Sequence, residues 1–269
     1  MGTMANPSAM TQVAQASEEA GYESIWTGEH IVLPEPQVPP SPLPPEAPII
    51  DTVVALTWMA AATSTIKLGT GIIILPQRRP AVLAKSLASL DVVSGGRLIC
   101  GFGVGYIDAE MNACDTPMAQ RGRRSDLYLE AMRRLWSEDA VSISNEFVQF
   151  DSITANPKPV QQPIPVVVGG HSKAAYRRAI TTAQGWYGFA RDVDAATADI
   201  AGLQEAAATY ERPAELGELE ISVTPPRRLQ AGQEEAYAAL GIDRLILQPG
   251  HHKPVDEILS YIDQNRPSA

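Results

Sequence analysis

Hydrophobic and polar positions switch repeatedly between helical and strand periodicity along the chain. Small apolar residues recur at helical spacing over 8–20 and stop at Gly21, after which 23–30 predict a short strand. The same reasoning predicts a helix after Ser172 and helices over 52–64, 80–93, 121–136, 194–210, 232–240 and 254–265. It predicts further strands over 67–76, 97–105, 164–170, 185–190, 219–224 and 244–249, and an irregular segment from 137 to 162.

The predicted strands are almost continuously apolar, most clearly over 164–170. Such strands are typical of a parallel sheet covered by helices. Two α/β architectures fit the alternation, a doubly wound open sheet and a closed eight-stranded barrel. The uniform pattern without a linker favours a single barrel domain over 1–269, although only seven strands are predicted.

Composition and charge narrow the class of protein. The chain has 269 residues, of which 45% are hydrophobic, and this excludes a disordered chain. A net charge of −10 disfavours nucleic acid and anionic membranes as partners. No Lys or Arg precedes Lys67, so no secretion signal is predicted, and the most apolar stretch, 53–62, is about half a membrane span. We expect a cytoplasmic protein that acts on a small molecule.

Glu29 and His30 end the first predicted strand. Barrel enzymes carry their catalytic groups at the carboxyl ends of strands, and a carboxylate beside an imidazole is suited to proton transfer. A purely structural histidine is the alternative. His251 and His252 follow the last strand without a further ligand at metal-binding spacing, so no metal site is predicted.

Two glycine-rich strand ends are candidate binding sites. Gly169, Gly170 and His171 lie between a buried strand and a helix, an arrangement that offers backbone N–H groups to a phosphate or merely serves the bend. The spacing over 101–105 is G-x-G-x-G, which does not match the dinucleotide-binding fingerprint. We expect these glycines to let a flat ligand approach the backbone.

A proline-rich segment follows the first predicted strand. Eight of the 22 prolines lie within 34–48, which predicts a loop with polyproline character. A surface connector and a lid over the substrate are both compatible with this composition.

Five blocks in order carry a family resemblance: 18–30 (EEAGYESIWTGEH), 61–71 (AATSTIKLGTG), 75–80 (LPQRRP), 90–98 (LDVVSGGRL) and 156–159 (NPKP). Together they resemble the luciferase-like monooxygenase superfamily, and within it the actinobacterial coenzyme F420-dependent oxidoreductases. The resemblance implies a TIM barrel with the deazaflavin ring at the carboxyl ends of the strands, and a homodimer. Relatives begin with a strand before the first helix. Because 1–7 offer none, we expect a barrel that lacks its first strand.

The resemblance also implies roles for particular residues. A cis peptide between Gly71 and Ile72 bulges against the ring, and Gly103, Val104 and Gly105 pass beside it. By the same resemblance, Gly169, Gly170 and His171 hold the cofactor phosphate. Because a net-acidic protein needs local positive charge to hold a polyanionic cofactor, Arg78, Lys173 and Arg177 are candidate cations.

His30 matches a histidine that contacts cofactor or substrate near the reacting carbon, and Glu29 replaces its aspartate neighbour. Tyr106 stands where sugar-phosphate dehydrogenases carry a glutamate, which disfavours sugar-phosphate oxidation and leaves Tyr106 as a candidate acid. The expected function is hydride transfer between F420 and a small organic substrate. An FMN-dependent monooxygenase and a cofactor-less barrel that binds a partner are the alternatives.

Overall fold

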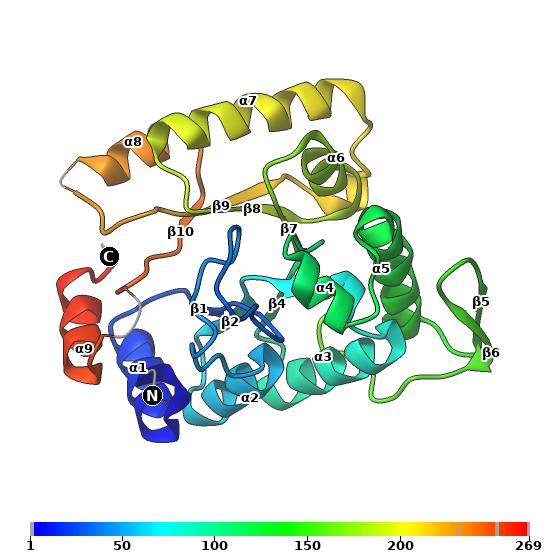
Figure 1. The fold of residues 1–269 in the computed structure, drawn as a ribbon, viewed down its shortest axis with the longest axis horizontal. Coiled ribbons are helices and arrows are strands. Elements are labelled where there is room, and N and C mark those ends of the chain that lie inside the picture. The colour runs from blue at the N-terminus through cyan, green and yellow to red at the C-terminus, as the bar shows by residue number, and fades with distance from the viewer. Residues whose placement is uncertain (1–2, 231, 251–252, 268–269) are drawn as a thin grey trace. The chain divides into compact units, whose positions relative to one another are not determined.

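Two compact units make up the chain. The structure, a computed structural model, describes residues 3–230, 232–250 and 253–267 (Figure 1). Unit 1 comprises Met1–Ile164 and Pro254–Ala269, and unit 2 comprises Pro165–Lys253. The single-domain organisation over 1–269 stays a prediction. His251 and His252 lie outside the described residues.

The sheet of unit 1 is parallel. Strands β1 (Ser24–Thr27), β2 (Lys67–Thr70) and β4 (Leu98–Gly103) lie side by side in that order, and β3 (Ile73–Ile74) pairs with the end of β4. The predicted strand over 67–76 is therefore divided into β2 and β3. The peptide bond between Gly71 and Ile72 is cis, as the resemblance implied.

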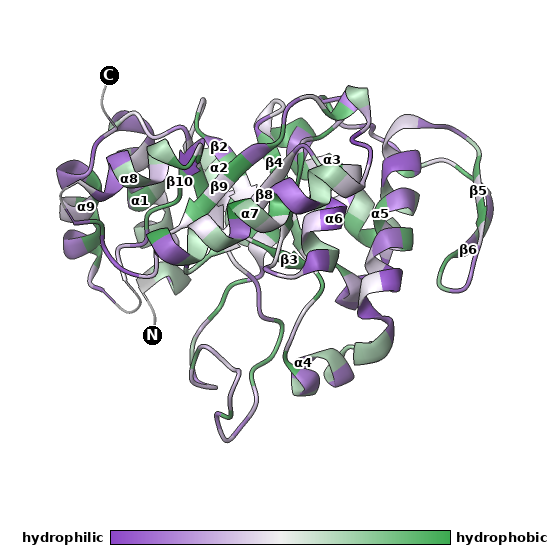
Figure 2. Ribbon diagram, turned by 90° about the horizontal axis from the view of Figure 1, so that it is seen from above, coloured by the Kyte–Doolittle hydropathy of each residue, from purple (hydrophilic) through white to green (hydrophobic). Residues whose placement is uncertain are grey.

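A row of helices covers unit 1. Its members pack in the order α9, α1, α2, α3, α5 and span Val255–Gln264, Pro7–Glu19, Thr52–Ala62, Pro80–Ser94 and Arg121–Ser137. Helix α9 joins the row because Ile258 and Ile262 pack against Val13 and Ala20. Hydrophilic and hydrophobic residues alternate around α5 (Figure 2), as expected for a helix with one buried face.

Unit 2 repeats the alternation of strand and helix. Strands β7 (Val166–Gly169), β8 (Gly185–Phe189), β9 (Glu220–Thr224) and β10 (Arg244–Leu245) form a parallel sheet. Its helices are α6 (Lys173–Thr182), α7 (Val193–Thr209) and α8 (Gln233–Ala239). Ser172 caps α6 as predicted, because its side chain accepts a hydrogen bond from the N–H of Ala175. The parallel strands of each unit, covered by helices, confirm the predicted α/β class.

The structure departs from the predicted elements at three further places. The segment predicted to be irregular contains an antiparallel hairpin, β5 (Val141–Ser144) and β6 (Gln149–Ile153). A short helix, α4 (Asp108–Ala113), follows β4, and β10 is shorter than predicted. Ahead of α1, the described residues form a 3-10 helix, Thr3–Ala5, and no strand, as predicted. Further 3-10 turns are η2 (Leu75–Gln77), η3 (Met118–Gln120) and η4 (Ala214–Leu216).

No helix within the described ranges combines the length and the apolar character needed to cross a membrane.

Glu18 fastens α1 to the turn after α2. Its carboxylate accepts hydrogen bonds from the backbone N–H groups of Ser64, Thr65 and Ile66, at 2.8, 2.6 and 2.9 Å from Oε1. Desolvation opposes ionisation, but these donors together lower the pKa of Glu18 to about 2. A carboxyl whose pKa falls on folding stabilises the fold above its unfolded pKa and loses that contribution as pH falls toward 2.

We therefore expect Glu18→Gln to lower the free energy of unfolding by about 1 kcal/mol at pH 7 and by much less at pH 3. Urea unfolding at the two pH values measures both differences. Glu19→Gln is the control because Glu19 is an exposed neighbour on the same helix. Equal stability of Glu18→Gln and wild type at pH 7 would refute the role of this carboxylate.

Candidate active site

The predicted site residues of unit 1 gather at the carboxyl ends of its parallel strands. Glu29 and His30 follow β1, the Gly71–Ile72 bond separates β2 from β3, and 103–105 end β4. The N–H of Gly71 donates to the carbonyl of Thr27 at 2.7 Å, which joins the ends of β1 and β2. Unit 1 thus brings together the residues that the resemblance placed near a ring.

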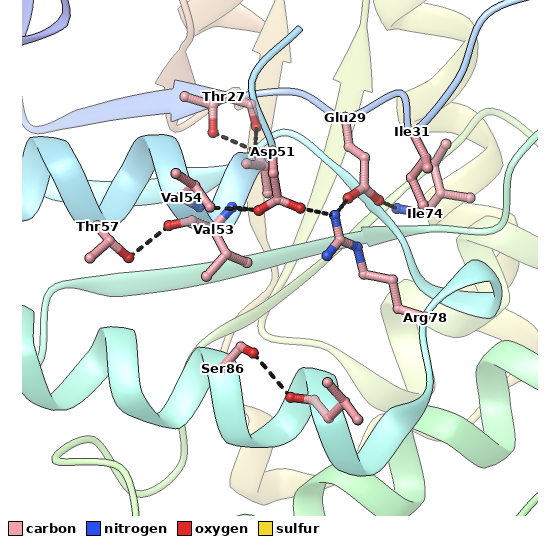
Figure 3. A network of polar contacts seen from close by, with 12 residues as sticks. Thr27, Glu29, Ile31, Asp51, Val53, Val54, Thr57, Ile74, Arg78 and Ser86 are labelled. Atoms are coloured by element: carbon pink, nitrogen blue, oxygen red, sulfur yellow. Dashed lines mark hydrogen bonds and ion pairs between the residues drawn. The ribbon is translucent and has the colours of Figure 1, made fainter. Parts of the chain in front are cut away.

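Arg78 bridges two carboxylates beside this strand end (Figure 3). Its guanidinium donates to Oε1 of Glu29 and, at 2.6 Å, to Oδ2 of Asp51. The other oxygen of Glu29 accepts from the N–H of Ile74 at 2.8 Å, so both of its oxygens are engaged. Asp51 also caps α2 by accepting from the N–H of Val53 at 2.9 Å.

This network holds both ends of the proline-rich loop, because Glu29 precedes the loop and Asp51 follows it.

Burial raises the pKa of Glu29, although Arg78 and the Ile74 N–H act in the opposite direction. Two carboxylates already bind the guanidinium of Arg78 and balance its charge, so contact of this candidate cation with a phosphate stays a prediction.

His30 is held by the carboxylate of Glu110, which is not among the predicted site residues. Its Nδ1 lies 2.9 Å from Oε2 of Glu110, and the other oxygen of Glu110 accepts from the N–H of Ile31 at 2.6 Å. Glu110 is 1% exposed, whereas 12% of the His30 side chain remains exposed. The ring of Tyr106 contacts the imidazole edge-on, with centroids 6.0 Å apart. Burial and Glu110 raise the pKa of Tyr106, so its hydroxyl is protonated at neutral pH.

Glu110 was missed because α4 is too short to give a periodic signal. The spacing of the apolar pair Ile107 and Met111, four residues apart with Glu110 between them, is a local sign of this helix, and acidic Asp108 in its first turn is another.

The glycines of β4 make room for a side chain of the neighbouring strand segment. A Cβ on Gly103 would lie 2.4 Å from Cδ1 of Ile72, and one on Gly101 would lie 2.0 Å from the carbonyl oxygen of Thr70. Packing against the backbone of Thr70 therefore gives Gly101 a structural reason, and Gly103 makes room for Ile72. The expectation that these glycines let a flat ligand approach the backbone stays a prediction. Contact of Gly103, Val104 and Gly105 with a cofactor stays a prediction.

In unit 2, Gly169, Gly170 and His171 form the turn between β7 and α6. Gly170 has φ +123°, and its carbonyl accepts from the indole N–H of Trp186 at 2.9 Å. Burial, reinforced by Arg191, lowers the pKa of His171, so this imidazole is neutral at pH 7. The turn supplies hydrogen-bonding groups rather than charge.

The candidate cations near this turn are on α6. Lys173 pairs with Glu205 at 3.1 Å, and both side chains are exposed, so the pair contributes little to stability. Arg177 is half-buried on the same helix. Whether Lys173 or Arg177 contacts a phosphate stays a prediction.

Comparison with known proteins defines the class to which this fold and site belong. The sequence profile described as luciferase-like monooxygenase matches residues 1–267. The chain belongs to this luciferase-like family, as its motifs predicted.

Two relatives and one solved structure indicate the range of the family. The F420-dependent glucose-6-phosphate dehydrogenase of Kineococcus radiotolerans is 31% identical over 176 residues, which cover 63% of this chain and 49% of the relative. The FMNH2-dependent dimethylsulfone monooxygenase of Pseudomonas putida is 33% identical over 132 residues, 48% of this chain and 36% of the relative. The chain matches about half or less of the length of these two relatives.

The crystal structure of the monooxygenase RslO1 from Streptomyces bottropensis superimposes with a TM-score of 0.74 at 21% identity, over 95% of this chain and 90% of that one. This likeness confirms the luciferase-like TIM-barrel type of fold. Family relatives are F420- or flavin-dependent oxidoreductases and monooxygenases, which confirms the predicted class of enzyme.

Proposed function

We propose that this protein is an F420-dependent oxidoreductase that transfers a hydride between the deazaflavin and a small organic substrate. The observation that carries the proposal is the anchored imidazole of His30, which lies at the strand end where 71–72 and 103–105 also meet. The F420-dependent relative supports the cofactor assignment.

The residues of unit 1 fit a flat ring. Gly71, Ile72, Val104 and Gly105 are neither fully buried nor charged, so they offer backbone and apolar surface at the end of the sheet. In this proposal they hold the ring, and Gly169, Gly170 and His171 hold the phosphate through N–H and imidazole groups.

A bound deazaflavin supplies a two-electron hydride acceptor or donor, because position 5 of its ring is carbon. In this proposal His30 accepts or donates the proton that accompanies the hydride. With an alcohol substrate, the hydride of the C–H bond would pass to a bound deazaflavin, His30 would take the O–H proton, and the C–O bond would become C=O. Glu110 balances the positive charge that His30 then carries. Glu29 assists by fixing the end of β1, since both of its oxygens are already bonded.

An FMN-dependent monooxygenase is the second candidate, and the FMNH2-dependent relative favours it. A cofactor-less binding protein is the third. The homodimer, the cytoplasmic location and the absence of nucleic-acid or membrane partners remain predictions.

Titration of the purified protein with F420 and, separately, with FMN tests the proposal. We expect saturable F420 binding with Kd on the order of 10 μM or lower, and FMN binding at least about 10-fold weaker. Cofactor fluorescence follows both titrations. Tighter binding of FMN would favour the monooxygenase, and no binding of either cofactor by folded protein would favour the third candidate.

A further inference from the structure

Glu110 connects the candidate catalytic histidine to the backbone of the following residue. One carboxylate oxygen lies 2.9 Å from Nδ1 of His30, and the other lies 2.6 Å from the N–H of Ile31. A carboxylate with two such partners has little freedom to rotate. The imidazole and the start of the proline-rich loop are therefore held by the same group.

The short helix that carries Glu110 is itself well anchored. Met111 is fully buried, and a Cβ on Gly105 would lie 2.5 Å from its sulfur. The amide of Gln77 approaches the same sulfur at 3.3 Å, and the N–H of Thr116 donates to the carbonyl of Met111 at 2.9 Å. These contacts fix the backbone position from which Glu110 reaches His30.

The chemistry of the pair selects one form of the imidazole. An ionised carboxylate only accepts hydrogen bonds, so Nδ1 of His30 must carry the hydrogen that points at Glu110. Neutral His30 then has its lone pair on Nε2, the nitrogen that can take a proton from a substrate. Glu29 cannot replace Glu110 in this role, because Arg78 and the Ile74 N–H occupy its oxygens.

We infer that Glu110 is a positioning residue that fixes the tautomer and orientation of His30 so that Nε2 serves as the base. The catalytic part of this inference rests on the proposed function, whereas the tautomer is a property of the protein without ligand.

Glu110→Gln tests the inference because glutamine keeps the shape of the side chain. Its carbonyl oxygen can still accept from Ile31, which turns its NH2 group toward Nδ1 of His30 and makes Nδ1 an acceptor. The hydrogen then moves to Nε2. In wild type we expect the 15N shifts of His30 to report hydrogen on Nδ1, and in Glu110→Gln we expect the assignment to reverse. Turnover should fall at least about 100-fold, while Kd for F420 changes less than about 3-fold.

Asp108→Asn is the matched control, since Asp108 is an exposed acid on the same helix. We expect wild-type 15N shifts and turnover for this variant. Glu110→Asp, which keeps the charge, covers the case in which the glutamine variant does not fold, and should retain hydrogen on Nδ1.

Wild-type His30 with hydrogen on Nε2, or an unchanged tautomer and turnover in folded Glu110→Gln, would overturn the inference. Failure of the wild type to bind F420 would instead reject the proposed function, and the NMR assignment would still decide the tautomer.

Discussion

Replacing His30 with alanine should lower turnover in an F420-linked assay by about 100-fold or more. Stability should fall by only about 1–3 kcal/mol, because the buried carboxylate of Glu110 loses one hydrogen-bond partner. General acid–base catalysis by one side chain typically contributes about 10²–10⁴-fold. The assay follows F420 absorbance with the most active member of a panel of alcohols and carbonyl compounds. Circular dichroism shows whether the variant retains its fold.

Tyr106→Phe tests whether Tyr106, the other candidate acid, transfers the proton instead of His30. Tyr106 contacts the imidazole edge-on, but burial and Glu110 raise the pKa of its hydroxyl. We expect Tyr106→Phe to retain turnover within about 5-fold of wild type, since His30 carries the proton in this proposal. Full activity of His30→Ala combined with a large loss in Tyr106→Phe would transfer the role to the tyrosine.

Replacing Arg78 with methionine should destabilise the protein by about 3–5 kcal/mol, because the buried carboxylate of Glu29 loses its counter-charge. Asp51 loses the same partner, and the two ends of the proline-rich loop are no longer joined. Chemical unfolding at pH 8 measures the loss. Arg123→Met provides a surface control, since Arg123 pairs with Glu146 where both side chains are exposed.

The pH dependence of the stability of Arg78→Met tests whether Glu29 causes this loss. A carboxyl whose pKa is raised on folding favours the fold below its unfolded pKa and loses that contribution as pH rises through its folded pKa. We expect the loss in free energy of unfolding caused by Arg78→Met to be largest at pH 8 and smaller at pH 5. Glu29→Gln in the same chain should restore part of the lost stability. If Arg78→Met lost the same stability at both pH values, and Glu29→Gln restored none of it, this explanation would be contradicted.

Long periodic segments allowed most of the fold to be predicted. Helices α1, α2, α3 and α5 lie within a few residues of their predicted bounds, because their apolar spacing spans three or more turns. The hairpin β5–β6 and helix α4 were missed. Each is short, and strands β5 and β6 bury few side chains, so neither leaves a strong pattern.

The sequence predicted only those site residues that are adjacent in the chain. Glu29 and His30 adjoin in the chain and end a strand, so their placement followed from the pattern. Their partners Arg78 and Glu110 lie 49 and 80 residues further on, and only the folded chain pairs them. A long-range ion pair leaves no periodic signal, which is why the sequence named Arg78 a candidate cation without its two carboxylate partners.

The most direct test of the cofactor assignment is NMR of 15N-labelled protein titrated with F420. We predict that amide resonances of Gly71, Ile72, Gly103, Val104 and Gly105 shift on binding, together with those of Gly169, Gly170 and His171. FMN at the same concentration should leave them largely unchanged. Shifts confined to other residues, or a stronger response of these amides to FMN, would contradict the proposal that this protein is an F420-dependent oxidoreductase.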